Sequence, residues 1–400
     1  MSHPLNFRDG KTLCPTSELQ AARLLRSLAC NQITTLSNIN HNCKLICSSM
    51  LFAFGSNGSG QLGLGHNDDV DVPKATLFSP SQPPNDLPVT VTAGGNHTII
   101  RTASGKAYTT GDNTDGRCGL TTPQVSQFHK LDWHEIKLCA ATWEATSFVD
   151  IHGCVYVCGT GNRGELGLGE SITHASKITS VSNFPPDGTS VIDFSASMGH
   201  TVAVLSNGEV WGWGNGRKGQ LGQPATYIWS PRKIIGIPFK AVRASCGKDF
   251  TFIVGPPDEG THIVIGSDKW NIISSAPELL PHWSTIGTGW GAIYVLLSSG
   301  KLLAWGRNDH SQLPPAGLPT LKNIVIGSEH ALAQTDSGQV LAWGWGEHGN
   351  CGPTENRGDV KDRWNEIPVT GGLKGIGAGC ATSWIITDQA YIQSATSPNA

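Results

Sequence analysis

Short runs of β-branched and other apolar residues recur along the chain, and glycine-containing turns separate them in pairs. Clear pairs flank the turns Ser104-Gly105, Asn207-Gly208, Ser299-Gly300 and Ser337-Gly338. Two such runs joined by a two-residue turn are typical of a β-hairpin, because glycine tolerates a positive φ there. The pattern therefore predicts a chain built mainly from strand pairs.

A two-part phrase that contains these runs occurs seven times. Its first part is clear as FAFGSNGSGQLGLG at 52–65 and WGWGNGRKGQLG at 211–222, and its second part as AGGNHTIIRT at 93–102 and SMGHTVAVLS at 197–206. Self-similarity at a period of about 40 to 55 residues marks a solenoid, propeller or array. Many short strands with a glycine and aromatic motif in each unit favour an all-β fold, a seven-bladed β-propeller.

The ends of the repeat predict how the ring closes. The first part of the phrase begins near residue 52 and the second part ends near residue 387. We therefore expect strands from both ends of the chain to complete the last blade, because a mixed blade removes an exposed sheet edge. The propeller should span 50–387, with a short tail at 388–400. The fifth unit, at 266–270, has lost the Gly-Gln-Leu-Gly turn, which predicts an irregular fifth blade.

Residues 1–49 lie outside the repeat, and we expect them to be a disordered extension with one short helix at 17–28. Two alternatives stay open. A second methionine, Met50, stands directly before the first repeat, so the extension is dispensable or results from a wrongly assigned start of translation. Alternatively, Arg8, Arg23 and Arg26 belong to an organelle-targeting segment.

Charge and hydropathy exclude several classes of partner. The formal net charge of −3 argues against a broad attraction for nucleic acid. No apolar run approaches the roughly 20 residues of a membrane-spanning helix, and no signal peptide opens the sequence. The 11 cysteines are irregularly spaced, which favours reduced thiols. We expect a cytoplasmic and nuclear protein that contacts neither nucleic acid nor a membrane.

Motifs that suggest catalysis or cofactor binding have simpler explanations here. The string G-x-G-x-x-G occurs at 159–164, 214–219 and 344–349, but no helix follows it, as a dinucleotide site would require. His97, His200 and His330 occupy one repeat position, which indicates a shared structural hydrogen bond rather than a metal site. No serine lies in a Gly-x-Ser-x-Gly elbow. The sequence predicts no catalytic residue, no cofactor and no metal.

Large and charged residues occupy loops that a blade needs only for turning. Exposed aromatic rings beside charges are what protein interfaces use as anchors. We therefore predict a partner-binding patch made of Trp143, Glu144, Lys248, Asp249, Trp290, Glu329, His330, Trp345, Glu347, His348 and Trp384. The tryptophans within strand-like runs should pack in the core instead; these are Trp211, Trp213, Trp305 and Trp343.

The phrases GQLGLG at 60–65 and GNHT at 95–98 resemble the RCC1 repeat, and the resemblance covers residues 51–387. Within that family, CGKDF at 246–250, GSEH at 327–330 and GCATSW at 379–384 are similar to the fungal alpha-tubulin suppressors, also called killer-toxin-insensitivity proteins. The resemblance implies a non-catalytic regulator that binds a small CSL-type zinc-finger protein of the diphthamide pathway, an electron carrier. It also implies support for Elongator-dependent modification of tRNA wobble uridines and for diphthamide synthesis, with any contact to Elongator indirect.

Two other functions remain open. The founding RCC1 protein is a guanine-nucleotide exchange factor for the small GTPase Ran, and such factors use a protruding hairpin as a wedge. Residues 169–192 are the longest candidate for that wedge in this chain. The other alternative is a scaffold or an adaptor of a ubiquitin ligase.

Overall fold

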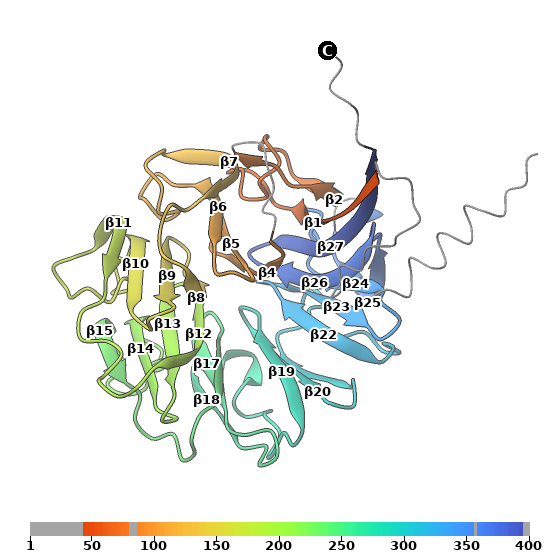
Figure 1. Ribbon diagram of the computed structural model, residues 1–400. Coiled ribbons are helices and arrows are strands. Elements are labelled where there is room, and N and C mark those ends of the chain that lie inside the picture. Colours follow the sequence, from red (N-terminus) through yellow and green to blue (C-terminus); the bar gives the residue numbers. More distant parts are fainter. Residues whose placement is uncertain (1–42, 80–85, 356–357, 395–400) are drawn as a thin grey trace, which may run out of the picture. The chain divides into compact units, whose positions relative to one another are not determined.

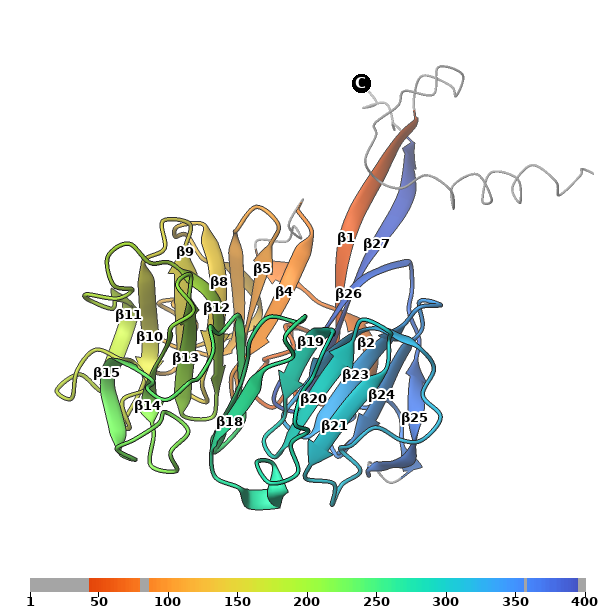
Figure 2. The ribbon, with the colours of Figure 1, turned by 90° about the horizontal axis from the view of Figure 1, so that it is seen from below.

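The computed structural model describes residues 43–79, 86–355 and 358–394. Seven sheets are arranged around one axis (Figure 1), which confirms the predicted all-β, seven-bladed propeller. Figure 2 shows the strands running between the two faces of the ring. We number the blades 1 to 7 by the order of their third strands, so that the blade built from both ends of the chain is blade 1.

Each blade begins at the axis and ends at the outside of the ring. From blade 1 to blade 7, the innermost strands are β26 (Gly372–Ala378), β4 (Pro88–Ala93), β8 (Ile136–Ala141), β12 (Val191–Ser197), β16 (Arg243–Cys246), β19 (Trp283–Thr288) and β22 (Leu321–Ile326). The second strands are β27 (Thr382–Ser394), β5 (His97–Thr102), β9 (Ala145–Asp150), β13 (His200–Leu205), β17 (Phe250–Val254), β20 (Ala292–Leu297) and β23 (His330–Thr335).

The third and outer strands complete the blades. The third strands are β1 (Cys43–Gly55), β6 (Ala107–Asp112), β10 (Val155–Thr160), β14 (Val210–Asn215), β18 (His262–Gly266), β21 (Leu302–Gly306) and β24 (Val340–Gly344). The outer strands are β2 (Val70–Ala75), β7 (Gln124–Lys130), β11 (His174–Ser180), β15 (Tyr227–Lys233) and β25 (Val360–Ile367). Blade 2 adds β3 (Phe78–Ser79), which runs parallel to β7.

Blade 1 joins the two ends of the chain in the sheet order β2-β1-β27-β26, which confirms the predicted closure. The propeller unit runs from Cys47 to Ala390, three residues beyond the predicted 50–387 at each end. The sequence phrase underestimates the strands because backbone pairing does not need the motif residues. The predictions for residues 1–42 and 395–400 lie outside the described residues, and the second unit, 1–46 with 391–400, is described only at the ends of β1 and β27.

Blades 5 and 6 have three strands each. In blade 5 a short 3₁₀ helix, η1 (Lys269–Asn271), stands where blades 1 and 4 have the Gly-Gln-Leu-Gly turn and the remaining blades have variants of it, and Trp270 adopts a φ of 67°. The predicted irregularity of blade 5 is thereby confirmed. The shortening of blade 6 was not predicted, because its turn keeps the Gln312-Leu313 pair and therefore matches the phrase.

The second strands lie inside the sheets, each between the innermost and the third strand of its own blade, and they include the most buried strands of the fold. Every residue of β9, β13 and β23 is buried, because each sheet is covered on both faces by another sheet. Of the four strand tryptophans, Trp213, Trp305 and Trp343 are buried, as predicted. Trp211 is only half-buried, and its indole N–H donates to Glu209.

A glycine ends the pairing of each third strand with its second strand. In all seven blades its φ lies between 103° and 121°, as at Gly214 and Gly344. A Cβ at these positions would lie 2.3 to 2.7 Å from a loop carbonyl oxygen of the same sheet. Both the left-handed backbone and the lack of space require glycine, which explains why an aromatic-glycine pair recurs in the phrase.

A side-chain donor from each blade binds the turn of the preceding blade. The acceptor is always a backbone carbonyl in the turn that follows the third strand, or in the segment that replaces it in blade 5. Around the ring these bonds are Thr110 to Gly60 (2.9 Å), Thr146 to Arg117 (2.8 Å), Trp213 to Glu165 (3.0 Å), Thr251 to Gln220 (2.7 Å), Trp305 to Ile272 (2.8 Å), Trp343 to Gln312 (3.0 Å) and Ser383 to Asn350 (2.7 Å).

Three of these hydroxyl groups also contact a buried histidine. The Nε2 atoms of His97, His200 and His330 lie 2.7, 3.0 and 2.9 Å from the side-chain oxygens of Thr146, Thr251 and Ser383. Because each hydroxyl donates its only proton to a carbonyl, it accepts from the histidine, which fixes the proton on Nε2. The predicted structural hydrogen bond at this repeat position is confirmed.

Burial keeps these three imidazoles neutral. Desolvation lowers the pKa of His97 to about 3, with the nearby Arg117 charge adding to the effect, and lowers the pKa values of His200 and His330 to about 4. The unfolded chain therefore binds more protons than the folded chain between pH 6.5 and about 4. Acidification through this range destabilises the fold.

We predict that His200→Gln weakens the pH dependence of unfolding. The glutamine amide still donates to Thr251 but does not titrate. Its free energy of unfolding should change less steeply below pH 6.5, by up to about 1.4 kcal/mol per pH unit. Chemical denaturation at a series of pH values measures the slope, and replacing the exposed His152 by glutamine is the control. An unchanged slope in His200→Gln would show that this histidine is not held neutral.

Candidate protein-binding site

One face of the ring carries the loops between innermost and second strands and the turns that follow the third strands; we call it the loop face. In every blade a backbone N–H at the end of the third strand donates to a backbone carbonyl of the loop before the second strand. Examples are Thr160 N to Glu144 O (2.9 Å) and Asn215 N to Gly199 O (2.7 Å). The hairpin turns such as Ser104-Gly105 lie at the opposite end of the strands, the hairpin face. The loop face therefore has a fixed backbone.

Backbone bonds also link neighbouring loops around the axis. Trp143 N donates to Met198 O (2.9 Å), Lys248 N to Trp290 O (3.1 Å) and Trp290 N to Ser328 O (2.8 Å). Bonds of this kind also join blades 2 and 3 (Gly95 N to Trp143 O, 3.1 Å) and blades 7 and 1 (Ser328 N to Gly379 O, 3.0 Å). Among the described residues, five of the seven blade boundaries are linked in this way, so most of the loops are tied into one rim. Such bonds fix the loop backbone before any partner arrives.

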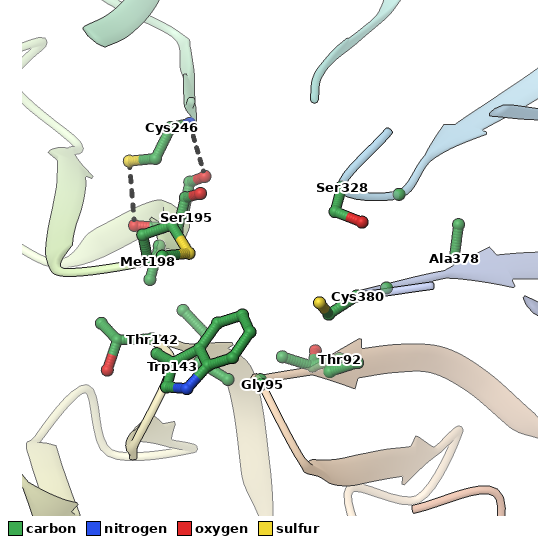
Figure 3. A pocket seen from close by; sticks show the side chains of 18 of the residues that line it. Thr92, Gly95, Thr142, Trp143, Ser195, Met198, Cys246, Ser328, Ala378 and Cys380 are labelled. Atoms are coloured by element: carbon green, nitrogen blue, oxygen red, sulfur yellow. Dashed lines mark hydrogen bonds between the residues drawn. The ribbon is translucent and has the colours of Figure 1, made fainter. Parts of the chain in front are cut away.

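A cavity of about 250 Å³ opens on the axis inside this rim. The ends of all seven innermost strands line it, and Figure 3 shows Thr92, Ser195, Cys246, Ser328 and Cys380 around it. Among the described residues, no charged side chain lines this cavity. Small, neutral groups make it suitable for an uncharged part of a partner.

The two tryptophans of the rim lie together beside the cavity. The ring centroids of Trp143 and Trp290 are 6.0 Å apart, and the Lys248 ammonium lies 5.4 Å from the centre of the Trp290 ring. Both rings are half-buried and Lys248 is exposed. The structure thus brings together three residues of the predicted patch that lie far apart in the sequence.

A second cavity, of about 330 Å³, adjoins the first across Trp143 and Met198. Its walls include Glu144 and Asp249 of the predicted patch. They also include Glu165, which the sequence analysis missed. Burial raises the pKa of Glu165, and the charge of Glu144 adds to the effect. The signal was present, because GELGLG at 164–169 places an acid where 60–65 has glutamine.

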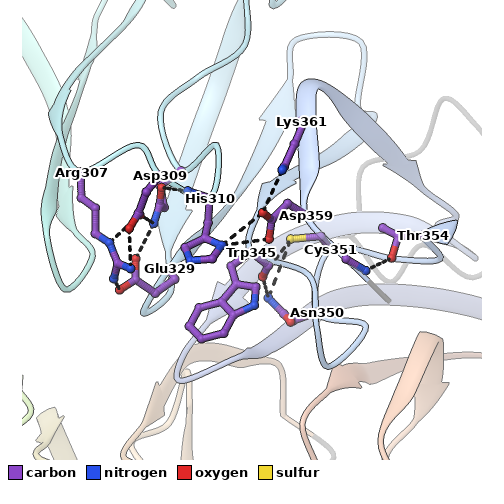
Figure 4. Close-up of polar contacts among 12 residues, drawn as sticks. Arg307, Asp309, His310, Glu329, Trp345, Asn350, Cys351, Thr354, Asp359 and Lys361 are labelled. Atoms are coloured by element: carbon purple, nitrogen blue, oxygen red, sulfur yellow. Dashed lines mark hydrogen bonds and ion pairs between the residues drawn. The ribbon is translucent and has the colours of Figure 1, made fainter. Parts of the chain in front are cut away.

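Three residues of the predicted patch do not lie on the surface. The exposed fractions of Glu329, His330 and Trp384 are 4%, 1% and 0%, so the expectation of an exposed position is wrong for all three. Trp384 packs in the core of blade 1, and His330 is held by Ser383. The Glu329 carboxylate pairs with Arg307, as Figure 4 shows. It also accepts a hydrogen bond from Gln312 (2.8 Å).

The remaining predicted residues lie on the loop face at blade 7. The half-buried Trp345 stacks on His310 with ring centroids 4.9 Å apart, and His310 contacts Asp359 (3.1 Å; Figure 4). Glu347 is exposed, and His348 Nδ1 lies 2.8 Å from an Asp69 oxygen of blade 1. His348 therefore also ties two blades together, whereas Glu347 is free to contact a partner.

Trp270 is an exposed aromatic residue that the sequence analysis overlooked. It is 41% exposed and lies between two cations, with the Lys269 ammonium 5.1 Å and the Arg307 guanidinium 5.4 Å from its ring centre. The fifth phrase was interpreted only as a degraded turn, so its tryptophan was not considered as a surface residue.

Within residues 43–79, 86–355 and 358–394, no group of three or more His, Cys, Asp or Glu residues is placed to hold a metal ion. In the same ranges, no helix has the length and apolar character needed to cross a membrane.

Known proteins share this architecture and parts of the sequence. The sequence model of the RCC1-like domain matches residues 50–385. The RCC1 repeat-containing protein C10F6.04 of Schizosaccharomyces pombe is 30% identical over 85% of this chain and 99% of that protein. The secretion-regulating guanine nucleotide exchange factor of Mus musculus is 28% identical, and the match spans 66% of this chain and 61% of that protein.

Solved structures show the same fold at low identity. Prp20p of Saccharomyces cerevisiae has a TM-score of 0.72 and 20% identity, covering 84% of this chain and 91% of that one. Human WBSCR16 has a TM-score of 0.70 and 17% identity, covering 85% of this chain and 99% of that one.

We predict that Arg307→Ala destabilises the fold and that Arg307→Ala with Glu329→Gln recovers most of the loss. Removing the guanidinium leaves the buried Glu329 charge unpaired, which costs about 3 to 5 kcal/mol. Burial already raises the pKa of Glu329 and Arg307 opposes that rise, so the loss should shrink on acidification as the carboxyl protonates. Urea denaturation at pH 5 and pH 8 tests this. An equal loss in the double variant would assign the effect to packing on Trp270 instead.

Proposed function

The chain belongs to the family of RCC1-like domains, and we propose that it is a non-catalytic regulatory protein whose loop face binds a small CSL-type zinc-finger electron carrier. The observation that supports this most is the cluster of Trp143, Trp290 and Lys248 at the mouth of the neutral axial cavity. Aromatic side chains beside a charge, held on a rigid rim, are the usual anchors of a protein interface.

The chemistry of this face suits a small metal protein. Because the rim loops are fixed by bonds between blades, binding orders few groups, and a modest contact area suffices for stable association. Three thiols line the axial cavity, those of Cys139, Cys246 and Cys380. Burial raises the pKa of each, so the thiols stay protonated and are poor competitors for the partner's metal. Covering a metal–thiolate centre excludes water from it and changes its redox behaviour.

The choice of a CSL-type partner rests on the resemblance of 246–250, 327–330 and 379–384 to the fungal alpha-tubulin suppressors. In this proposal the complex supports Elongator-dependent modification of wobble uridines and diphthamide synthesis, in the cytoplasm and the nucleus. The chain itself does not touch tRNA, because a net charge of −3 gives no broad attraction for phosphate.

We predict that Trp143→Ala and Trp290→Ala each weaken binding of a purified CSL-type zinc-finger protein by at least about tenfold, the loss expected for a central aromatic anchor. Isothermal titration calorimetry measures the affinity. Trp133→Ala is the matched control, because Trp133 is also half-buried but lies in the connection between β7 and β8, which meets the hairpin face where Ile136 N donates to Gly105 O (2.7 Å). Full affinity in both loop-face variants would exclude this patch, and no binding by the wild type would exclude the partner.

Guanine-nucleotide exchange is the second candidate, and the name of the mouse relative favours it. The segment 169–192 does not form a free hairpin, because β11 takes up 174–180 and pairs with β10. We therefore expect no wedge from this segment and no acceleration of GDP release from a Ran-like small GTPase. A fluorescent-nucleotide release assay measures this directly, and a large acceleration would replace the first proposal with the second.

A further inference from the structure

The turn that follows the third strand needs a side-chain oxygen but no charge. In three blades a glutamine supplies it: Gln61 Oε1 accepts from Ser59 N (2.8 Å), Gln220 from Lys218 N (2.8 Å) and Gln312 from His310 N (2.9 Å). In blade 3 a carboxylate accepts the equivalent hydrogen bond, from Arg163 N to Glu165 Oε2 (2.7 Å). The negative charge of Glu165 is thus more than the fold requires.

The loop opposite this turn leaves a hollow. The turn of each blade faces the loop of the next blade, as the bond from Gln312 to Glu329 shows. Opposite Glu165 that loop position is Gly199, whereas Glu144, Asp249 and Glu329 occupy it in other blades. A Cβ on Gly199 would meet Glu165 Oε1 only at 3.4 Å, so nothing on the loop fills the space. The second cavity, of about 330 Å³, lies there.

The walls of this hollow combine an aromatic ring with an excess of carboxylates. Trp143 and Met198 form the side toward the axis, and Glu144, Glu165 and Asp249 supply three acids against the two cations Arg163 and Lys248. Lys248 is already engaged with Trp290. Among the described residues, no lysine or arginine nitrogen lies within ion-pair distance of the Glu165 carboxylate.

We propose that this cavity, the Glu165 socket, receives an arginine side chain of a partner protein. A guanidinium is planar, so it can stack on an indole and donate two parallel hydrogen bonds to a carboxylate. The socket offers both groups, Trp143 and Glu165, in one cavity that only one side chain needs to enter. The inference deepens the proposed function, because it rests on the loop face being the surface that binds a protein.

Because burial raises the pKa of Glu165, an incoming cation relieves an existing cost at this carboxylate. The hollow is also specific to this blade boundary. At the other loop glycine, Gly291, the side chains of Trp270 and Arg307 already occupy the space, within 3.2 Å of where a Cβ would lie. That comparison indicates how a guanidinium and an indole fit over a loop glycine in this fold.

The test uses N-acetyl-L-arginine amide as the probe and N-acetyl-L-citrulline amide as its neutral isostere. Nuclear magnetic resonance titration of the full chain should show arginine binding at least about tenfold tighter than citrulline, because only the guanidinium makes charge-assisted bonds. Glu165→Gln should lose that preference and still fold, since glutamine makes the same turn bond in three other blades. Equal affinities for the two probes would overturn the proposal.

Two further variants make the result specific. Gly199→Asn introduces the residue that blade 2 has at this position, Asn96, and should abolish arginine binding by filling the hollow. The exposed Glu170, replaced by glutamine, is the control and should bind arginine like the wild type. Undiminished binding in Gly199→Asn or Glu165→Gln would place the arginine elsewhere and overturn the socket.

A titration with the CSL-type protein separates this inference from the proposed function. If the arginine probe binds through Glu165 but the CSL-type protein does not bind, the socket stands and the choice of partner fails. If the CSL-type protein binds while the arginine probe does not, the partner stands and the socket fails. If both bind and Glu165→Gln weakens both by about tenfold, the partner's arginine occupies the socket.

Discussion

A hydrogen bond from one blade to the turn carbonyl of the blade before it holds the ring together. It recurs at all seven boundaries, with threonine, serine or tryptophan as the donor. At three boundaries a buried histidine donates to the same hydroxyl, so that the hydroxyl is satisfied on both sides. Buried polar groups are costly unless paired, and this pairing therefore selects one register between blades.

The position of these bonds explains why the loop face can vary without loss of the fold. The turns are held through backbone carbonyls and the loops through backbone bonds to the third strands. Side chains such as Trp143, Lys248 and Trp290 take no part in the backbone bonds and are free to serve recognition. In blade 3 a side chain holds the turn, because Glu165 Oε2 accepts from Arg163 N. This bond requires a side-chain oxygen at position 165, but it does not require that the side chain be charged.

The repeat made the fold predictable, because each phrase encodes a hairpin, a glycine bend and a turn by local rules. The repeat region begins with the first part of the phrase, near residue 52, and ends with the second part, near residue 387. This arrangement predicted that strands from both ends would close the ring in blade 1. The three-stranded blade 6 did not follow, since an outer strand such as β11 carries no phrase residue and its presence depends on pairing alone. The extent of β1 and β27 was underestimated for the same reason.

The site was only partly predictable. The sequence indicated Trp143, Lys248 and Trp290, because a loop that only reverses the chain does not need large or charged side chains. The closed ring then brings these three residues together. Glu329 and Trp384 depart from it equally, but a neighbouring Arg307 and the blade 1 core bury them, and such tertiary contacts leave no local pattern. Glu165 was missed because it is a one-atom change from glutamine within an otherwise regular phrase.

The strand order of blade 1 has a consequence for synthesis of the chain on the ribosome. The hairpin of β1 and β2 is made first, but its neighbour β27 begins only at Thr382. At about 5 to 20 residues per second, the intervening chain takes tens of seconds to emerge. During that delay one edge of β1 has no partner strand, so blade 1 cannot be completed until β27 has emerged.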